Sequence, residues 1–346
     1  MIKVLVVDDS AFMRKIVSDI FNQTPGFIVM DTARSGLDAI EKLKRNKPDV
    51  ITMDVEMPGM DGLSALKIIM EQYPTPVVML SSLTKDGAEA TLKALELGAI
   101  DFVAKAGGVI ADISSVQEEL VQKVRAAAHV NVRQLSKQNM QILKPIIKLN
   151  IVPFTGEQVV AIGTSTGGPR ALQEIISKIP ANFPAGILIV QHMPPGFTKS
   201  LSERLNSLSV IRVKEAENGD VVRPGLALIA PGDYHMRVIK GPQQQVQIKL
   251  SQEAPINGHR PAVDPMMQSV AEIFQQNTVG VILTGMGTDG SVGIKKIKER
   301  GGRTIAEDES SAVVYGMPRA AVELGVVDKV TPLLMVANEI IRCVTK

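Results

Sequence analysis

The chain has 346 residues, about 2.3 times the length of a 150-residue domain, and this length predicts two domains. Hydrophobic residues make up 45% and charged residues 21% of the composition, which excludes a disordered or fibrous chain. The formal net charge is +2, and aromatic residues make up 3% with no tryptophan, so the composition predicts no nucleic-acid partner through global charge or base stacking.

Cysteine usage and the N-terminal segment predict the compartment. The single cysteine, Cys343, excludes an intrachain disulfide framework and a multi-cysteine zinc site, and it favours a reducing compartment. Asp8 and Asp9 interrupt what would be the apolar region of a secretory signal peptide. No run approaches the ~18 consecutive apolar residues of a membrane helix. We therefore expect a cytoplasmic protein without direct membrane insertion.

The first 130 residues alternate short apolar runs with amphipathic segments of helical period. Strands that alternate with helices in this way predict an α/β domain with a doubly wound, parallel sheet. The five predicted strands are residues 3–7, 27–33, 49–53, 76–80 and 101–104.

A stretch without any acidic residue, 121–156, follows these strands. Its basic residues are widely spaced, and Pro145 and Pro153 interrupt any long helix, so we interpret it as a solvated connector rather than a nucleic-acid or membrane patch. The predicted division is a first domain at residues 1–130, a linker at residues 131–155 and a second domain at residues 156–346.

The second domain resumes the alternation of strands and helices. Apolar strands are predicted at residues 157–163, 185–190 and 278–285, and each ends in a Gly-rich or Pro-rich turn before a helical segment. This pattern predicts a second doubly wound, parallel α/β sheet, Rossmann-like with three layers. Shorter strands joined by NGD, GD and GP turns at residues 210–238 and 245–252 predict a small antiparallel portion.

Polar residues end several strands of the first domain. Asp8 and Asp9 end the first strand, Asp54 the third, Ser81 the fourth and Lys105 the fifth. The carboxyl ends of parallel strands meet at one edge of a sheet, where three carboxylates repel one another unless a cation neutralises them. Magnesium fits this donor set, because it binds a few carboxylates and keeps water positions that phosphate oxygens can take.

These residues resemble the receiver domain of bacterial two-component response regulators, a flavodoxin-like fold. The motifs are VVDDS, MDVEMPGMDG, LSS and FVAK, in that order within roughly residues 1–125. The resemblance implies that a phosphoryl group is accepted by Asp54 and recognised by Ser81 and Lys105. It also implies a Mg²⁺ site whose ligands are Asp8, Asp9, Asp54 and the carbonyl of Glu56.

The chain departs from this family at one position. The family usually has proline after the lysine, in a cis peptide bond, whereas this chain has Ala106. A cis bond before a residue other than proline costs about 2.5–4 kcal/mol, so we expect the site to be kept without the cis geometry.

A motif of the form G-x-S-x-G opens the second domain, at Gly163, Ser165 and Gly167. It lies between a predicted strand and a predicted helix, which is the arrangement of a nucleophile elbow: a tight turn exposes the serine hydroxyl beside free N–H groups. A helix cap and a phosphate-binding loop are alternative interpretations of the same residues.

Four histidines are candidates for a general base. His192 directly follows a strand and is expected at the same sheet edge as Ser165, so it is the best placed. His129 is expected at the surface. His235 and His259 are expected in loops, where His259 with Arg260 could line a substrate rim. This comparison favours His192 as the base.

A third member of a catalytic triad should be a carboxylate at another strand end. Asp289 follows an apolar strand and could orient the imidazole of His192. The backbone N–H groups of Thr166 and Met286 are the expected oxyanion support. The chain order Ser, His, Asp differs from that of α/β-hydrolases, where the acid precedes the histidine, so similar chemistry on a separate architecture is expected.

A competing hypothesis uses the same region. Gly285, Gly287 and Gly290 form G-x-G-x-x-G between a strand and a helix, and Glu307 and Asp308 follow the next strand, as in a dinucleotide-binding site. An aspartate inside that loop would repel a pyrophosphate. A phosphorylation-controlled, dinucleotide-dependent oxidoreductase therefore remains as the alternative, whereas a DNA-binding output is disfavoured because no compact module with a basic recognition helix is present.

The second domain resembles the catalytic domain of chemotaxis protein-glutamate methylesterases of the CheB type. The shared motifs are IGTSTGGP, QHMPPGFT, LIAPGDYHM, GHRPAVD, LTGMGTDG and YGMPRAA. The resemblance implies Ser165 as nucleophile, His192 as general base and Asp289 as its orienting acid, with no cofactor for the esterase. It implies glutamate methyl esters and specific glutamines of methyl-accepting chemotaxis receptors as substrates, and a chemotaxis histidine kinase as phosphodonor.

The order of receiver, linker and enzyme carries an expectation about control. The unmodified receiver is expected to cover the catalytic cleft, and phosphorylation of Asp54 to shift a two-state equilibrium towards release.

Overall fold

The computed structural model describes residues 1–105, 113–132 and 158–345. The chain divides into two compact units, Met1–Ile142 and Leu143–Lys346. The predicted linker, residues 131–155, lies almost entirely outside the described residues. No helix in the described ranges is long and apolar enough to cross a membrane.

The first unit contains a five-stranded sheet with the order β2-β1-β3-β4-β5, and every neighbouring pair is parallel. Each predicted strand is confirmed to within one residue. The strands are β1 (Ile2–Val7), β2 (Phe27–Ala33), β3 (Val50–Asp54), β4 (Val77–Ser81) and β5 (Asp101–Ala104). Strands β3 and β4 are buried throughout, as expected for central strands covered on both faces.

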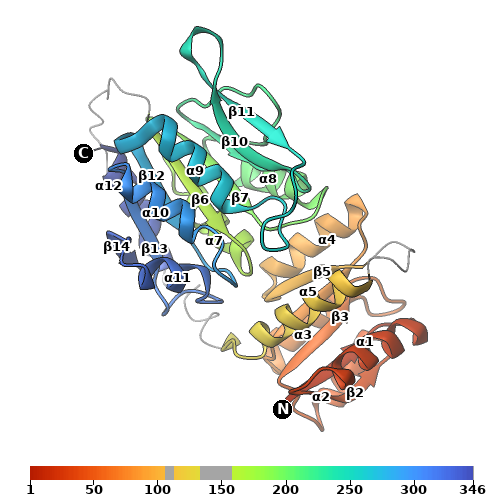
Figure 1. The fold of residues 1–346 in the computed structure, drawn as a ribbon. Helices are drawn as coiled ribbons and strands as arrows, with labels where there is room; N and C mark the ends of the chain where they lie inside the picture. Colours follow the sequence, from red (N-terminus) through yellow and green to blue (C-terminus); the bar gives the residue numbers. More distant parts are fainter. Residues whose placement is uncertain (106–112, 133–157, 346) are drawn as a thin grey trace. The chain divides into compact units, whose positions relative to one another are not determined.

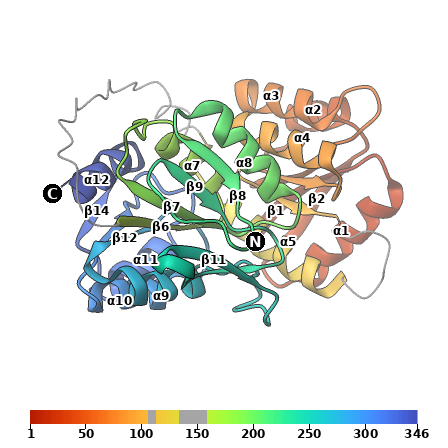
Figure 2. The ribbon, with the colours of Figure 1, turned by 90° about the horizontal axis from the view of Figure 1, so that it is seen from above.

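Helices cover both faces of this sheet. Helices α1 and α5 lie on one face and α2, α3 and α4 on the other (Figure 2). Most begin at a serine, threonine or aspartate whose side chain accepts a hydrogen bond from the first turn, so the sequence itself marks the starts. The helices are α1 (Ala11–Gln23), α2 (Gly36–Leu43), α3 (Gly62–Gln72), α4 (Lys85–Glu96) and α5 (Ile113–Ala127).

The second unit contains a seven-stranded parallel sheet with the order β14-β13-β12-β6-β7-β9-β8. The strands are β6 (Gln158–Thr164), β7 (Ala185–Gln191), β8 (Arg212–Glu215), β9 (Leu226–Ile229), β12 (Thr278–Ile282), β13 (Arg303–Glu307) and β14 (Lys329–Thr331). Strand β6 lies at the centre between β12 and β7, so its carboxyl end is flanked by the ends of both neighbours (Figure 1).

Three layers result, as predicted. Helices α9, α10 and α11 cover one face of the sheet and α7, α8 and α12 the other (Figure 2). The helices are α7 (Gly168–Ile176), α8 (Phe197–Leu208), α9 (Val263–Phe274), α10 (Ser291–Glu299), α11 (Met317–Glu323) and α12 (Leu333–Thr345). The core under α9 and α10 is built from Leu, Val, Ile and Met side chains of the strands and helices.

The predicted antiparallel portion is confirmed, but it is smaller than the turn signals implied. Strands β10 (His235–Lys240) and β11 (Val246–Ser251) form an antiparallel hairpin. Strands β8 and β9 instead join the main sheet and pair in parallel. The NGD turn lies within the connection between them, residues 216–225, which returns the chain to the start of the next strand. The GP turn, Gly241–Pro242, instead joins β10 to β11.

Candidate functional sites

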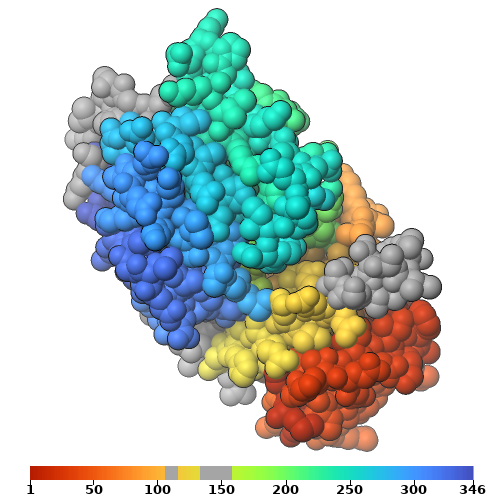
Figure 3. Space-filling view, in the orientation of Figure 1, coloured from red at the N-terminus to blue at the C-terminus, as the bar shows by residue number. Residues whose placement is uncertain are grey.

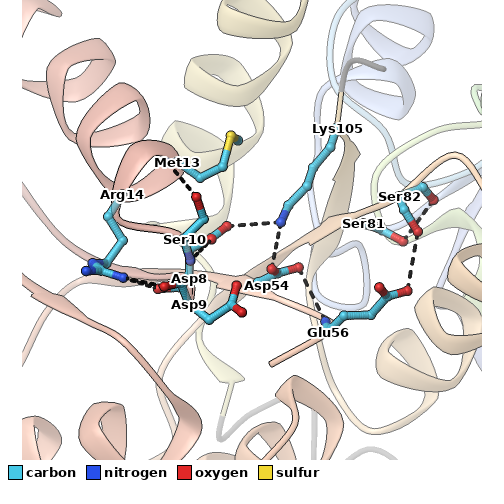
Figure 4. Close-up of polar contacts among 10 residues, drawn as sticks. All are labelled: Asp8, Asp9, Ser10, Met13, Arg14, Asp54, Glu56, Ser81, Ser82 and Lys105. Carbon is cyan, nitrogen blue, oxygen red and sulfur yellow. Dashed lines mark hydrogen bonds and ion pairs between the residues drawn. The ribbon is translucent and has the colours of Figure 1, made fainter. Parts of the chain in front are cut away.

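The acidic residues of the first unit meet at one edge of its sheet, as predicted. Carboxylate oxygens of Asp8, Asp9 and Asp54 lie within 4.8 Å of one another. Nζ of Lys105 lies 2.7 Å from Asp54 Oδ2 and 3.0 Å from Asp8 Oδ2, and Figure 4 shows it between the two carboxylates. Nη1 of Arg14 donates to the carbonyls of Asp8 and Asp9 at 2.8 and 2.9 Å and so fixes the turn that presents them.

The ionisation of Asp54 depends on its lysine partner. Burial raises the pKa of Asp54, while the hydrogen bond and charge of Lys105 lower it, and the net direction is upward. Burial lowers the pKa of Lys105, but the pairs with Asp54 and Asp8 outweigh burial and raise it. The lysine is therefore held charged over a carboxylate that lies at the strand end.

The remaining predicted receiver residues lie beside this pair. Ser81 is buried, and its hydroxyl donates to the carbonyl of Gly87 in α4 at 3.0 Å, so it must rotate before it can contact a group on Asp54. The N–H of Glu56 donates to Asp54 Oδ1 at 3.3 Å. The Glu56 side chain accepts from Ser82 Oγ at 3.4 Å (Figure 4). The peptide bond before Ala106 involves a residue outside the described residues.

The donor set fits a hard divalent cation. Three carboxylates converge, one of them on the exposed Asp9, and oxygen is the ligand atom that magnesium prefers. Lys105 supplies a single positive charge for Asp8 and Asp54, so a second cation at Asp8, Asp9 and Asp54 would relieve the remaining repulsion.

The predicted elbow in the second unit is a strand-turn-helix, as the motif requires. Ser165 directly follows β6, Gly167 has φ +79°, and α7 begins at Gly168. A side chain on Gly168 would place its Cβ 1.9 Å from Gln191 Oε1 and 2.6 Å from Thr164 Oγ1, so any larger residue would force the Gln191 and Thr164 side chains to shift. The serine is nearly buried, with 8% of its surface exposed.

His192 follows β7 as Ser165 follows β6. The register pairs Thr164 with Gln191, so Ser165 and His192 are the next residues on two adjacent strands. The N–H of His192 donates to the carbonyl of Thr164 at 3.2 Å. Nε2 of Gln191 donates to the carbonyls of Ser165 and His192 at 2.9 and 3.2 Å and so bridges the two backbones.

Asp289 contacts the histidine, as predicted. Its Oδ2 lies 2.7 Å from His192 Nε2, and both side chains are almost fully buried. Burial opposes the charge of Asp289, but hydrogen bonds from His192 and from the N–H groups of Val263 and Asp264 lower its pKa, so the carboxylate stays ionised. The other ring nitrogen of His192, Nδ1, is buried without a hydrogen-bond partner in the described part of the chain.

The other histidines occupy positions that the sequence did not fix. His259 stacks on His192, with ring centroids 4.0 Å apart and planes 14° apart. The loop position expected for His235 is wrong, since this residue begins β10 and is fully buried, with Nδ1 accepting from the N–H of Ala262. His129 is exposed, as predicted. Arg260 forms an ion pair with Asp233 and donates to the carbonyls of Gln252 and Glu253. It therefore connects the loop that contains Asp233 with the segment that follows β11.

The two residues expected to support an oxyanion lie beside the serine. Thr166 follows Ser165, and its carbonyl accepts from Thr284 Oγ1 at 2.8 Å. The backbone of Gly285 packs against Ser165 so closely that a Cβ there would lie 2.9 Å from Ser165 Cβ, and Met286 follows it. The carbonyl of Thr284 accepts from the N–H of Ser165 at 3.0 Å, which ties the loop after β12 to the elbow.

A buried carboxylate that sequence reasoning assigned to another role supports this loop. Glu307 is fully buried and accepts from the N–H of Thr284 at 2.8 Å and from Ser311 Oγ at 2.9 Å. Burial raises its pKa to about 7. In the sequence, Glu307 lies at the end of an apolar strand. That position is equally typical of a carboxylate that accepts hydrogen bonds in the core and of one that binds the ribose of a dinucleotide.

Glu307 should make the second unit less stable as the pH rises. The pKa of Glu307 is about 7 in the folded protein, whereas its ordinary value is 4.5, so the folded state holds the proton more tightly than the unfolded state. The free energy of unfolding therefore falls as the pH rises from about 4.5 to 7. The full difference corresponds to about 3 kcal/mol. Glu307→Gln should flatten this dependence. Urea unfolding of both proteins from pH 5 to 8 measures it, and parallel curves would contradict the assignment.

The dinucleotide alternative conflicts with this geometry. A pyrophosphate would need the free N–H groups at the start of α10, but the carboxylate of Asp264 already accepts from the N–H of Gly293 at 2.6 Å. The Asp289 carboxylate also occupies the glycine loop, and Glu307 is turned into the core rather than towards a ribose. The carboxylates of Asp264, Asp289 and Glu307 therefore accept hydrogen bonds from the protein's own backbone, in place of binding a dinucleotide.

An acidic receiver-like site in one α/β unit and a serine, histidine and aspartate at the sheet edge of the other define a response regulator with an enzymatic output domain. Residues 160–340 match the family model of the CheB methylesterase, and residues 4–114 match the response regulator receiver domain. The chain belongs to the CheB methylesterase family and carries a receiver domain. Both resemblances stated from the motifs are thereby confirmed.

Two relatives match the chain over nearly its whole length. The chain is 52% identical over 341 residues to a protein-glutamate methylesterase/protein-glutamine glutaminase of Archaeoglobus fulgidus, covering 98% of this chain and 97% of that protein. It is 48% identical over 346 residues to the protein of the same description from Thermotoga maritima, covering 99% and 98%. The crystal structure of the Thermotoga maritima CheB methylesterase catalytic domain is 49% identical, with a TM-score of 0.53, and covers 54% of this chain and 98% of that one.

Proposed function

We propose that the chain hydrolyses glutamate methyl esters on chemotaxis receptors, with release of methanol, and deamidates specific receptor glutamines, as part of sensory adaptation. The observation that carries this proposal is the placement of Ser165 and His192 on adjacent strand ends, with Asp289 2.7 Å from the imidazole. The relatives described as protein-glutamate methylesterase/protein-glutamine glutaminase, at about half identity over nearly the whole chain, support the substrate class.

We infer the roles in the reaction from the hydrogen-bond pattern. Asp289 stays ionised and accepts from Nε2–H of His192, which leaves the lone pair on Nδ1. That nitrogen takes the proton of Ser165 as the hydroxyl oxygen attacks the ester carbonyl. The backbone N–H groups of Thr166 and Met286 stabilise the oxyanion, the protonated imidazole returns the proton to the leaving methoxide, and water then hydrolyses the acyl-enzyme.

Deamidation follows the same steps on a primary amide. The protonated His192 delivers its proton to the departing nitrogen, and ammonia leaves in place of methanol. Nitrogen is the poorer leaving group, so this reaction is the slower of the two. No cofactor is needed for either reaction.

The receiver domain carries the control. We assign Asp54 as the residue that accepts a phosphoryl group from a chemotaxis histidine kinase, and Asp8, Asp9, Asp54 and the Glu56 carbonyl as the Mg²⁺ ligands. Bound magnesium would neutralise charge on the phosphoryl oxygens. Lys105 and, after rotation, Ser81 would bind the oxygens of the phosphorylated side chain. We place the reaction in the cytoplasm, without membrane insertion and without nucleic acid.

Removal of residues 1–155, the proposed receiver and linker, should raise basal methanol release. The reason is that an unphosphorylated receiver that inhibits the enzyme lowers the fraction of competent enzyme, and the apparent affinity for substrate falls with that fraction. The measurement compares kcat/KM of the truncated and the unphosphorylated full-length chain on methylated receptor membranes. Equal or lower activity of the truncated chain would show that the receiver stimulates without inhibiting.

The proposed function itself is tested by methanol release from methyl-esterified receptor membranes, with and without a small phosphodonor and Mg²⁺. Methanol release that increases with the phosphodonor is expected. Titration with nicotinamide cofactors tests the oxidoreductase alternative in the same preparation. Saturable cofactor binding without methanol release would overturn the proposal.

A further inference from the structure

Helices α9 and α10 both begin without a capping side chain of their own. The residues that precede their first turns are Ala262 and Gly290, and neither supplies a side-chain acceptor. The first N–H groups of a helix have no partner within it, and a buried helix start requires an acceptor from elsewhere. Other helices of this chain start at a serine, threonine or aspartate whose own side chain accepts a hydrogen bond from the first turn. The starts of α9 and α10 have no such residue.

Each of the two helices is capped by an aspartate from the other's segment. Asp289, which precedes α10, accepts from the N–H groups of Val263 and Asp264 at the start of α9, at 2.6 and 3.1 Å. Asp264, in the first turn of α9, accepts from the N–H of Gly293 at the start of α10, at 2.6 Å. The N–H groups of Gly290 and Val292 also favour its charge. We define this exchange as the reciprocal cap.

The two helix starts are packed closely against each other. A Cβ on Gly293 would lie 2.5 Å from Met267 Cβ, and one on Gly290 would lie 2.6 Å from a methyl group of Ile282. Helices α9 and α10 lie side by side, on the face seen in Figure 3. Asp264 is buried, and burial raises its pKa to about 6, with the charge of Asp289 acting in the same direction. A buried charge of this kind is retained at a cost to stability.

We propose that Asp264 is a positioning residue of the esterase reaction: through the reciprocal cap it fixes the segment that carries Asp289, and through Asp289 it orients His192. This inference rests on the proposed function. The carboxylate of Asp289 makes its bond to His192 with the same oxygen, Oδ2, that accepts from Val263, so a shift of α10 against α9 moves that oxygen away from the ring. Asp264 acts only through these neighbours.

The test compares Asp264→Ala with Asp264→Asn in the full-length chain. Alanine removes the acceptor for α10, whereas asparagine keeps one oxygen for Gly293. We expect Asp264→Ala to lower kcat for methanol release by about 10- to 100-fold with KM little changed, because misplacement of a catalytic group by about 1 Å costs on that order. Asp264→Asn should restore most of that loss.

A spectroscopic measurement separates positioning from general destabilisation. The chain has four histidines, so ¹⁵N-histidine labelling yields four ring systems, and the His192→Gln variant assigns the signal of His192. Its Nε2 proton, hydrogen-bonded to Asp289, should resonate far downfield in the wild type. That signal should be lost or moved upfield in Asp264→Ala and be regained in Asp264→Asn.

Asp328→Asn is the matched control. Asp328 also accepts from a backbone N–H, that of Thr304, but at the amino edge of the sheet, opposite the site. It should lower the melting temperature without changing kcat or the downfield signal. A folded Asp264→Ala protein with wild-type kcat and an unchanged signal overturns the inference. If that protein does not fold, Asp264→Asn with activity as low as background overturns it, because the retained acceptor should suffice. Activity that survives Ser165→Ala refutes the proposed function instead.

Discussion

Ser165→Ala is expected to abolish methanol release from methylated receptors, with a loss in kcat of at least about 10⁴-fold. The substitution removes only the hydroxyl group, whose oxygen, Oγ, forms the bond to the acyl group in the proposed reaction. Binding of the receptor and the oxyanion donors remain, so a small rate above the uncatalysed reaction should persist. Methanol is quantified under saturating substrate, where kcat is obtained directly.

The control for this variant is Ser202→Ala. Ser202 is also a buried serine, but its hydroxyl donates to the carbonyl of Lys199 within the same helix, α8. It should leave kcat unchanged. The Ser165→Ala protein is judged folded if its melting temperature is unchanged. If that folded protein keeps near wild-type activity, Ser165 is not the nucleophile and the proposed mechanism is wrong.

Asp54→Asn should abolish phosphorylation and the activation that depends on it. An amide has no anionic oxygen to attack a phosphodonor, although it keeps the size of the side chain and can still accept from the N–H of Glu56. The expected result is no label from a radioactive small phosphodonor with Mg²⁺, and basal methanol release that no longer rises when the phosphodonor is added.

Asp19→Asn serves as the control for phosphorylation. Asp19 is a partly exposed aspartate of α1 that pairs with Lys15, and its replacement by asparagine should leave both the label and the activation intact. Label on the Asp54→Asn protein at the wild-type level would place the phosphoryl group elsewhere. Loss of label without loss of activation would separate the acidic site from the control of the enzyme.

The strands and the two motif-bearing turns were predictable because their signals are local. Apolar runs with two-sided burial marked β1, β3, β4, β6 and β7. The G-x-S-x-G spacing predicted the turn at Ser165 because a positive φ at Gly167 and close approach at Gly168 leave few other residues possible. Chain order and strand ends then placed His192 and Asp289 at one edge.

The turns between β8 and β9 show where local signals fail. The NGD sequence is typical of a tight turn, and the sequence therefore favoured antiparallel neighbours there. Leu226–Ile229 instead lie between β7 and β8 and pair in parallel with both, because these four residues are buried and gain most by joining the main sheet. Burial of a whole segment is a property of the assembled sheet, and a turn motif carries no information about it.

By itself the sequence determined the two α/β domains, the acidic strand ends of the first, and the serine, histidine and aspartate of the second, because each is encoded in a run of a few residues. Only the tertiary structure decided which nitrogen of His192 meets Asp289, that His259 stacks on that ring, and that Asp264 and Asp289 cap each other's helices. Those contacts join residues that are far apart in the chain. They depend on how the helices and strand ends pack against one another, which no local run of residues encodes.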